Sequence, residues 1–102
     1  MSLIEEVLKE EYERLSRIER SLMLELDELP KGSIQKKKIK ERYYYYLMYR
    51  DGEKIKSQYL SAEEVPEIRK LIDKRKEDEK ALKEIRNNKE KILKSIGKEA
   101  ID

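Results

Sequence analysis

The sequence predicts an α+β fold: a long N-terminal helix, a three-stranded antiparallel β-ribbon, and a long C-terminal helix that forms an antiparallel helical hairpin with the first. Three observations predict it: leucines at a seven-residue spacing before Pro30, a tyrosine-rich run closed by Asp51-Gly52, and a helical apolar pattern after Pro66. We expect a single domain over residues 1–102, made of a helix at 2–29, a ribbon at 33–60, a helix at 62–96 and a tail at 97–102.

Composition limits how large a core the chain can form. Of its 102 residues, 47% are charged and 37% are hydrophobic, whereas about a quarter of residues are charged in a typical soluble domain. A chain this polar suits long helices that each bury one apolar stripe, often against a second copy. We therefore expect a homo-oligomer that associates through its helices. The regular apolar spacing argues against disorder, which is the alternative for such a composition.

Several classes of function are disfavoured by residues that the chain lacks. It has no His and no Cys, so it offers no imidazole base, no thiolate nucleophile and none of the usual zinc ligands. Its three glycines are isolated and form no phosphate-binding loop. We expect no enzymatic activity, and no metal, cofactor or small-molecule substrate. Because there is no signal peptide and no long apolar run, we expect a cytoplasmic protein without a membrane partner.

The N-terminal helix is predicted from its heptad spacing. Leu8, Leu15, Leu22 and Leu29 recur every seven residues and form an apolar stripe of the coiled-coil type. Residues 2–5 fit a capping box. The helix should end at residue 29, because the residue before a proline is disfavoured in the helical region.

The ribbon is predicted from three short runs separated by turn signals. Residues 34–38, 42–50 and 53–60 are expected to be strands, with a type I′ turn at Asp51-Gly52. That turn places Met48 opposite Ile55 and Tyr44 opposite Tyr59. The register of the first strand is left open.

Alternation along these strands divides the side chains between two faces. We expect the drier face to pack on a helix; it carries Tyr44, Tyr46, Met48, Ile55 and Tyr59. The other face interleaves tyrosines with lysines and is the candidate contact surface; it carries Tyr43, Tyr45, Leu47, Tyr49, Lys54, Lys56 and Gln58.

The C-terminal helix is predicted to begin near a second capping box at residues 61–64 and to stop at Gly97. We expect a short turn and then a helix with Pro66 in its first position; a start at Ala62 with a kink is the alternative. Residues 73–80 contain no apolar side chain, and Asn87-Asn88 has low helix propensity. Whether the helix is continuous through both is left open. Pairing the stripes places Ile4 near Ile92 and residues 73–80 beside Glu19.

Charge is concentrated in the middle of the chain. Residues 30–58 carry nine Lys or Arg against three Asp or Glu, whereas residues 1–29 carry four against nine. The cations of the ribbon could neutralise phosphates while its tyrosines stack on bases. Alternatively, the lysines protect sheet edges and the tyrosines form cross-strand pairs. The candidate nucleic-acid-binding residues are Lys36, Lys37, Lys38, Lys40, Arg42, Tyr43, Tyr45, Tyr49, Lys54 and Lys56.

A resemblance accompanies this pattern. Gly32-Ser33-Ile34, residues 43–47, residues 49–54 and Ser57-Gln58-Tyr59 resemble small uncharacterised prokaryotic helix–β-ribbon–helix proteins. More loosely, they resemble the arm-type three-stranded DNA-binding domains at the N-termini of phage and transposon integrases. That likeness implies that a sheet face contacts DNA, through Lys36, Lys38, Tyr43, Tyr45, Lys54 and Lys56. The chain departs from those proteins in its long first helix and in lacking a recombinase domain.

These observations favour a non-enzymatic nucleic-acid-binding accessory protein, with a mobile element as one setting. They do not distinguish DNA from RNA. The alternative is a structural or protein-binding oligomeric coiled-coil module, such as an adaptor, an antitoxin-like partner or a prefoldin-like chaperone. The prefoldin likeness rests on the helix–hairpin–helix layout alone.

Overall fold

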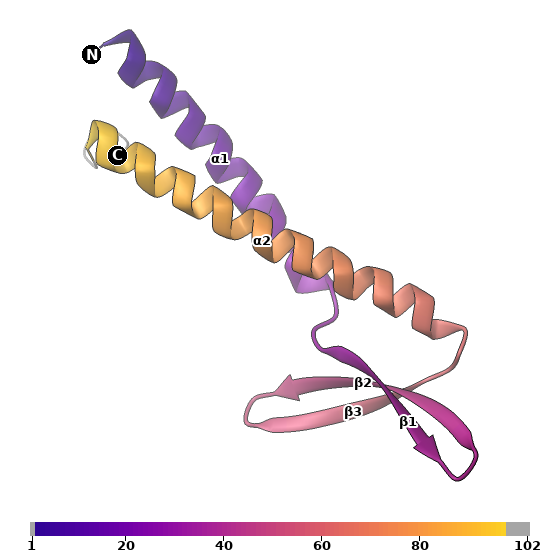
Figure 1. Ribbon diagram of the computed structural model, residues 1–102. Coiled ribbons are helices and arrows are strands. Elements are labelled where there is room, and N and C mark those ends of the chain that lie inside the picture. Colours follow the sequence, from indigo (N-terminus) through magenta and orange to yellow (C-terminus); the bar gives the residue numbers. More distant parts are fainter. Residues whose placement is uncertain (1, 98–102) are drawn as a thin grey trace. The chain divides into compact units, whose positions relative to one another are not determined.

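The computed structural model describes residues 2–97 and confirms the α+β class. Its elements are α1 (Leu3–Glu28), β1 (Ser33–Ile39), β2 (Arg42–Asp51), β3 (Lys54–Leu60) and α2 (Glu64–Ile96), as Figure 1 shows. The chain forms two compact units: a helical unit, from α1 and the part of α2 that begins at Asp78, and a sheet unit, Leu29–Glu77. Beyond Gly97, the predicted tail lies outside the described residues.

Both ends of α1 follow from the local sequence. The Ser2 hydroxyl accepts a hydrogen bond from the Glu5 amide at 3.1 Å, which satisfies one of the unpaired amides of the first turn. The helix ends at Glu28, two positions before Pro30, in accord with the prediction.

The second helix is continuous where the sequence left the question open. The Glu64 amide donates to the Ser61 hydroxyl at 3.3 Å. The helix begins at Glu64, so Pro66 is its third residue and not its first as predicted; it still lies in the first turn, where its missing N–H would have no helical partner. The helix then runs unbroken to Ile96, through residues 73–80 and through both asparagines. Gly97 closes it, with φ +85° and an amide that donates to the Leu93 carbonyl at 2.8 Å.

The helical unit buries a narrow apolar stripe. Within it α1 and α2 run antiparallel (Figure 1) and bury Leu15, Leu26, Leu82 and Ile92. The predicted register is wrong, because Glu19 binds Arg86 and Lys89 and not residues 73–80. This displacement moves α1 toward the C-terminal end of α2. Ile4 is accordingly 72% exposed and has no share in the buried stripe that contains Ile92.

The sheet has the order β1-β2-β3, and both pairings are antiparallel. Tyr46 pairs with Tyr59 and Met48 with Ser57, so the predicted β2–β3 register is wrong by two residues. The cause is the turn: Asp51 still pairs with Lys54, and Gly52-Glu53 forms the two-residue loop. Gly52 has φ +66°, which suits glycine at the first central position of a type II′ turn. Because the error is an even number, each residue keeps its predicted face.

The assignment of the two faces is also wrong. Leu47 and Leu60 lie on the face that was predicted to be the contact surface, and they form the buried core with Val65 and Ile72 of α2. Pairing explains the reversal: β1 brings Ile34 opposite Leu47, and β3 brings Leu60 opposite Tyr45. Three aliphatic side chains thus gather on this face, whereas tyrosines keep a polar hydroxyl that favours water. Partly buried side chains packed against this core are Ile34, Tyr45, Tyr49 and Ile68.

Candidate nucleic-acid interface

The face of the sheet turned away from this core carries a group of aromatic rings. We call it the open face; it comprises Ser33, Gln35, Lys37, Ile39, Arg42, Tyr44, Tyr46, Met48, Arg50, Ile55, Ser57 and Tyr59. The ring centroids of Tyr46 and Tyr59, paired across β2 and β3, lie 5.9 Å apart in an edge-to-face arrangement. The Tyr44 ring lies 6.5 Å from that of Tyr59. Tyr59 is 58% exposed, so these rings form a surface feature.

Three consecutive lysines of β1 place their ammonium groups over tyrosine rings. Lys36 Nζ lies 4.3 Å from the centroid of the Tyr43 ring, and Lys38 Nζ lies 5.8 Å from the same centroid. On the open face, Lys37 Nζ lies 5.1 Å from the centroid of Tyr46. Cation–π attraction of this kind orients a lysine without neutralising its charge. The edge strand β1 therefore carries oriented positive charge on both of its faces.

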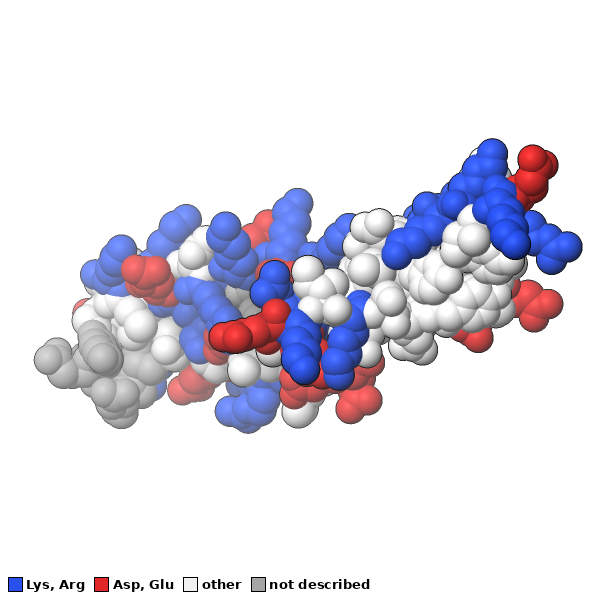
Figure 2. Space-filling view, turned by 90° about the horizontal axis from the view of Figure 1, so that it is seen from below, with Lys and Arg blue, Asp and Glu red and all other residues white. Residues whose placement is uncertain are grey.

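Carboxylates neutralise little of this charge. Lys56 is paired with Asp51 at 2.7 Å, close to the β2–β3 turn. Within residues 2–97, no carboxylate forms an ion pair with Lys36, Lys37 or Lys38. Figure 2 shows a group of Lys and Arg side chains beside a white area at the right-hand end of the visible face, the side on which the β1–β2 turn lies in Figure 1. The positive charge of the sheet unit thus faces solvent.

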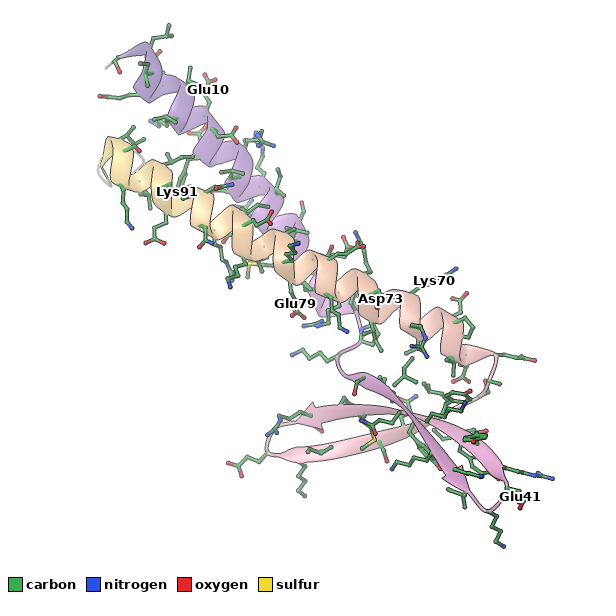
Figure 3. The ribbon with its side chains drawn as sticks, in the orientation of Figure 1. Glu10, Glu41, Lys70, Asp73, Glu79 and Lys91 are labelled. Atoms are coloured by element: carbon green, nitrogen blue, oxygen red, sulfur yellow. The ribbon has the colours of Figure 1, made fainter. Side chains whose placement is uncertain are left out.

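The β1–β2 turn adds a cation at some conformational cost. Lys40 and Glu41 form the turn (Figure 3 labels Glu41), and Lys40 has φ +58°. A residue with a Cβ atom loses about 1 kcal/mol or more in this left-handed region, where glycine would lose little. The turn nevertheless carries a lysine beside the other basic residues of the hairpin.

The structure brings most of the predicted binding residues together but not all of them. The β1–β2 hairpin gathers exposed candidates: Lys36, Lys37, Lys38, Lys40, Arg42 and Tyr43. Tyr45 and Tyr49 pack against the core instead, because they share the face of Leu47. Lys54 and Lys56 are exposed on β3, with Lys56 held by Asp51.

Sequence reasoning missed the tyrosines of the open face. The sequence predicts that Tyr44, Tyr46 and Tyr59 pack on a helix, because the face that they share with Met48 and Ile55 carries no lysine among its predicted residues. The positions of Leu47 and Leu60 hold the signal that would have found them, since leucine is far more often fully buried than tyrosine.

The helical unit uses its charges differently. Glu19 accepts hydrogen bonds from Lys89 at 2.7 Å and from Arg86 at 2.8 Å. These bonds, first from Lys89 and then from Arg86, hold the pKa of Glu19 below its ordinary value. Lys89 Nζ also lies 4.7 Å from the centroid of the Tyr12 ring. This cluster joins α1 to α2 and has a structural role.

Other kinds of site find little support. Among residues 2–97, no group of acidic side chains is arranged to hold a metal ion. Neither helix, over its described length, has an apolar stretch long enough to span a bilayer.

Comparison with known families gives one match, to a family described as a domain of unknown function (DUF6788), over residues 2–70. The match covers α1, the whole sheet and the first turns of α2, which is more than half of the chain. It gives no support to the likeness with arm-type DNA-binding domains. Searches of curated proteins and of solved structures find no significant match. The chain therefore belongs to the DUF6788 family, a domain of unknown function.

Proposed function

We propose that the protein is a non-enzymatic nucleic-acid-binding protein that holds DNA or RNA on its basic three-stranded sheet. The observation that carries the proposal is the β1 lysine cluster, Lys36, Lys37 and Lys38, which is oriented by tyrosine rings and unpaired with any carboxylate of residues 2–97. Lysines in such a row displace counterions from a phosphate backbone. This release supplies affinity that falls steeply as salt rises.

Protection of an exposed sheet edge is the simpler explanation for lysines on β1. The other edge strand offers a comparison. On β3, Lys56 is neutralised by Asp51, so one of its two lysines adds little net charge to that edge. On β1 three lysines are adjacent, and the turn adds Lys40 at a positive φ. Edge protection alone does not call for that concentration of unneutralised charge, whereas a polyanionic ligand does.

A labelled oligonucleotide tests the proposal. The fluorescence anisotropy of a mixed-sequence oligonucleotide should report saturable binding that weakens strongly between low and moderate salt. In Lys36→Glu/Lys37→Glu/Lys38→Glu the affinity should fall by about tenfold or more, since phosphate contacts become repulsive. Far-UV circular dichroism should show unchanged helicity.

The matched control reverses the same number of charges in the helical unit. Lys80, Lys83 and Lys91 are exposed on α2, so their triple change to Glu alters net charge equally without touching the sheet. This control should keep most of the affinity. Equal losses in the two variants would reduce the effect to overall charge and remove the sheet from the account.

A second candidate function is protein binding, including self-association through the helices. The observation that favours it is the first two turns of α1, where Leu3, Ile4 and Val7 are all exposed. Such an exposed apolar group suits contact with another chain. Sedimentation equilibrium should then report an oligomer that Ile4→Ser/Val7→Ser dissociates. A monomer at all concentrations would dismiss self-association.

A further inference from the structure

We infer that the preferred ligand is a single strand, DNA or RNA, whose unpaired bases stack on Tyr44, Tyr46 and Tyr59 of the open face. This inference rests on the proposed nucleic-acid-binding function and adds the class of ligand. It differs from the phosphate contacts already described, because it concerns the aromatic rings themselves: of the three, only Tyr46 lies under a β1 lysine, and Tyr59 carries no lysine within the cation–π contacts of residues 2–97.

The arrangement of the three rings supports base stacking. Tyr46 and Tyr59 lie opposite each other on the adjacent strands β2 and β3, with ring centroids 5.9 Å apart. The Tyr44 ring centroid lies 6.5 Å from that of Tyr59. The rings are inclined to one another, by 73° and 54°, so they do not stack face to face among themselves. The exposed Tyr59 ring therefore remains available to an incoming base. Aromatic side chains on a sheet are a recurrent platform for unpaired bases.

A duplex cannot use this platform. Its bases are stacked on one another, so only their edges are accessible in the grooves. A single strand exposes the flat surface of each base, and stacking contributes about 1 to 3 kcal/mol per base. The open face therefore adds affinity for unpaired nucleic acid only, whereas the lysines of β1 attract both forms.

The positions of the lysines fit a backbone that follows β1. Lys37 pairs with Tyr44 across β1 and β2 and points to the same face as the three rings. Its ammonium group lies 5.1 Å from the Tyr46 ring. Lys36 and Lys38 lie at the same edge on the opposite face, over Tyr43. Phosphates running along this edge would meet all three cations while their bases turn inward over the tyrosines. The cations that would bind phosphates and the aromatic rings that would stack on bases thus lie beside each other along β1.

Tyr59 provides the test, because its side chain is 58% exposed on the open face and, within residues 2–97, its ring orients no lysine. Anisotropy titrations would use unstructured 12-mers of thymidine and of uridine, and a mixed-sequence duplex of the same length. The wild type should bind the single strands at least about tenfold more tightly than the duplex.

In Tyr59→Leu, single-strand affinity should fall by about 5- to 100-fold, the loss expected from one stacked base. Duplex affinity and the salt dependence should stay the same. Tyr59→Phe keeps the ring and should retain most of the affinity. Tighter binding of either the thymidine or the uridine oligomer supports the inference, provided that Tyr59→Leu weakens it.

The inference and the function on which it rests fail in different ways. Equal binding of duplex and single strands, unchanged in Tyr59→Leu, would overturn the stacking platform and leave the basic sheet as a duplex or backbone binder. A loss of affinity in Tyr59→Phe as large as in Tyr59→Leu would also overturn it, because the aromatic ring would then contribute nothing to binding. No saturable binding of any of the three oligonucleotides would overturn the proposed function itself.

Discussion

The two units of this chain treat their charged side chains in opposite ways. In the helical unit, acids and bases pair with each other: Glu19 binds Arg86 and Lys89, and Glu90 binds Lys94. In the sheet unit, the β1 lysines lie over tyrosine rings and remain exposed to solvent. A net charge of only +2 therefore conceals a difference between the units: ion pairs join the two helices, whereas Lys36, Lys37 and Lys38 form no ion pair with a carboxylate of residues 2–97.

Apolar side chains show a parallel contrast. The helical unit buries a stripe of aliphatic residues along two helices, whereas the sheet unit buries a compact cluster of Leu47, Leu60, Val65 and Ile72. Four tyrosines of the sheet remain outside that cluster, and three of them, Tyr44, Tyr46 and Tyr59, lie on the open face. Core formation thus explains Ile34, Leu47 and Leu60 of the ribbon but not its open-face tyrosines, and the following changes test that division.

The largest effect should come from the centre of the sheet-unit core. Leu60 is 1% exposed, so Leu60→Ala should destabilise the sheet unit by about 2 to 5 kcal/mol through lost burial and a new cavity. Six of the seven tyrosines belong to this unit, so near-ultraviolet circular dichroism in urea reports its unfolding. Leu24→Ala, at a position 64% exposed on α1, is the control. An equally small effect for both variants would contradict the core described above.

A comparison of two glycines should give the next largest effect. Gly32 has φ +118°, and an added Cβ would collide with the Met48 carbonyl oxygen. Gly52 has φ +66° and open space around it. Gly32→Ala should cost about 2 kcal/mol or more, from collision and strain together, and Gly52→Ala about 1 kcal/mol, from strain alone. Urea unfolding checks the order, and a reversed order would contradict the close approach at Gly32.

Ion pairing in the helical unit predicts a smaller, pH-dependent effect. Glu19→Gln should cost about 1 to 2 kcal/mol near pH 7, because it leaves the cation of Lys89 poorly paired. The folded pKa of Glu19 lies below its ordinary value of 4.5. Its contribution is therefore complete above about pH 4.5 and is lost as pH falls through the lower folded pKa.

Unfolding followed by far-ultraviolet circular dichroism at several pH values measures this contribution to stability. The difference in free energy of unfolding between the wild type and Glu19→Gln should be widest near pH 7. It should narrow below pH 4.5, where the wild-type carboxylate becomes protonated. Glu11→Gln, in an exposed pair with Arg14, should have little effect at any pH. A gap that stays constant down to pH 2 would mean that the pair does not stabilise the helical unit.

The smallest effect is expected at the β1–β2 turn. Lys40→Gly should stabilise the sheet unit by a few tenths to about 1 kcal/mol, because glycine relieves the positive φ at the cost of a more flexible unfolded chain. It should also weaken oligonucleotide binding slightly. Thermal unfolding and anisotropy together check the trade, and lower stability in Lys40→Gly would contradict strain at this turn.

The elements themselves were predictable because each has strong local signals. Heptad leucines, Pro30 and Gly97 delimit the helices, and the observed bounds differ from the predicted ones by one or two residues. The register was not predictable from Asp51-Gly52 alone, since a two-residue loop at either Asp51-Gly52 or Gly52-Glu53 satisfies the chain. Only pairing along the full strands decides between them.

The positive charge of the candidate site could be predicted from the sequence, but the face of the sheet that is buried could not. The lysines of β1 are close in sequence, so their clustering needed no tertiary information. Which face is buried depends on Ile34, whose face follows only from the observed β1–β2 pairing, and on the contact of Leu47 and Leu60 with α2. Tertiary packing therefore places Tyr45 and Tyr49, predicted to lie on the contact surface, against the core. It leaves Tyr46 and Tyr59, predicted to pack on a helix, on the other face.

The most direct test of the central claim compares the two units in one experiment. Amide chemical-shift changes would be mapped on the full chain during titration with a single-stranded oligonucleotide. We expect chemical-shift changes concentrated on β1 and on the open-face residues of β2 and β3, with the helical unit nearly unaffected. Changes spread along α1 and the Asp78–Ile96 part of α2, with the sheet silent, would contradict it.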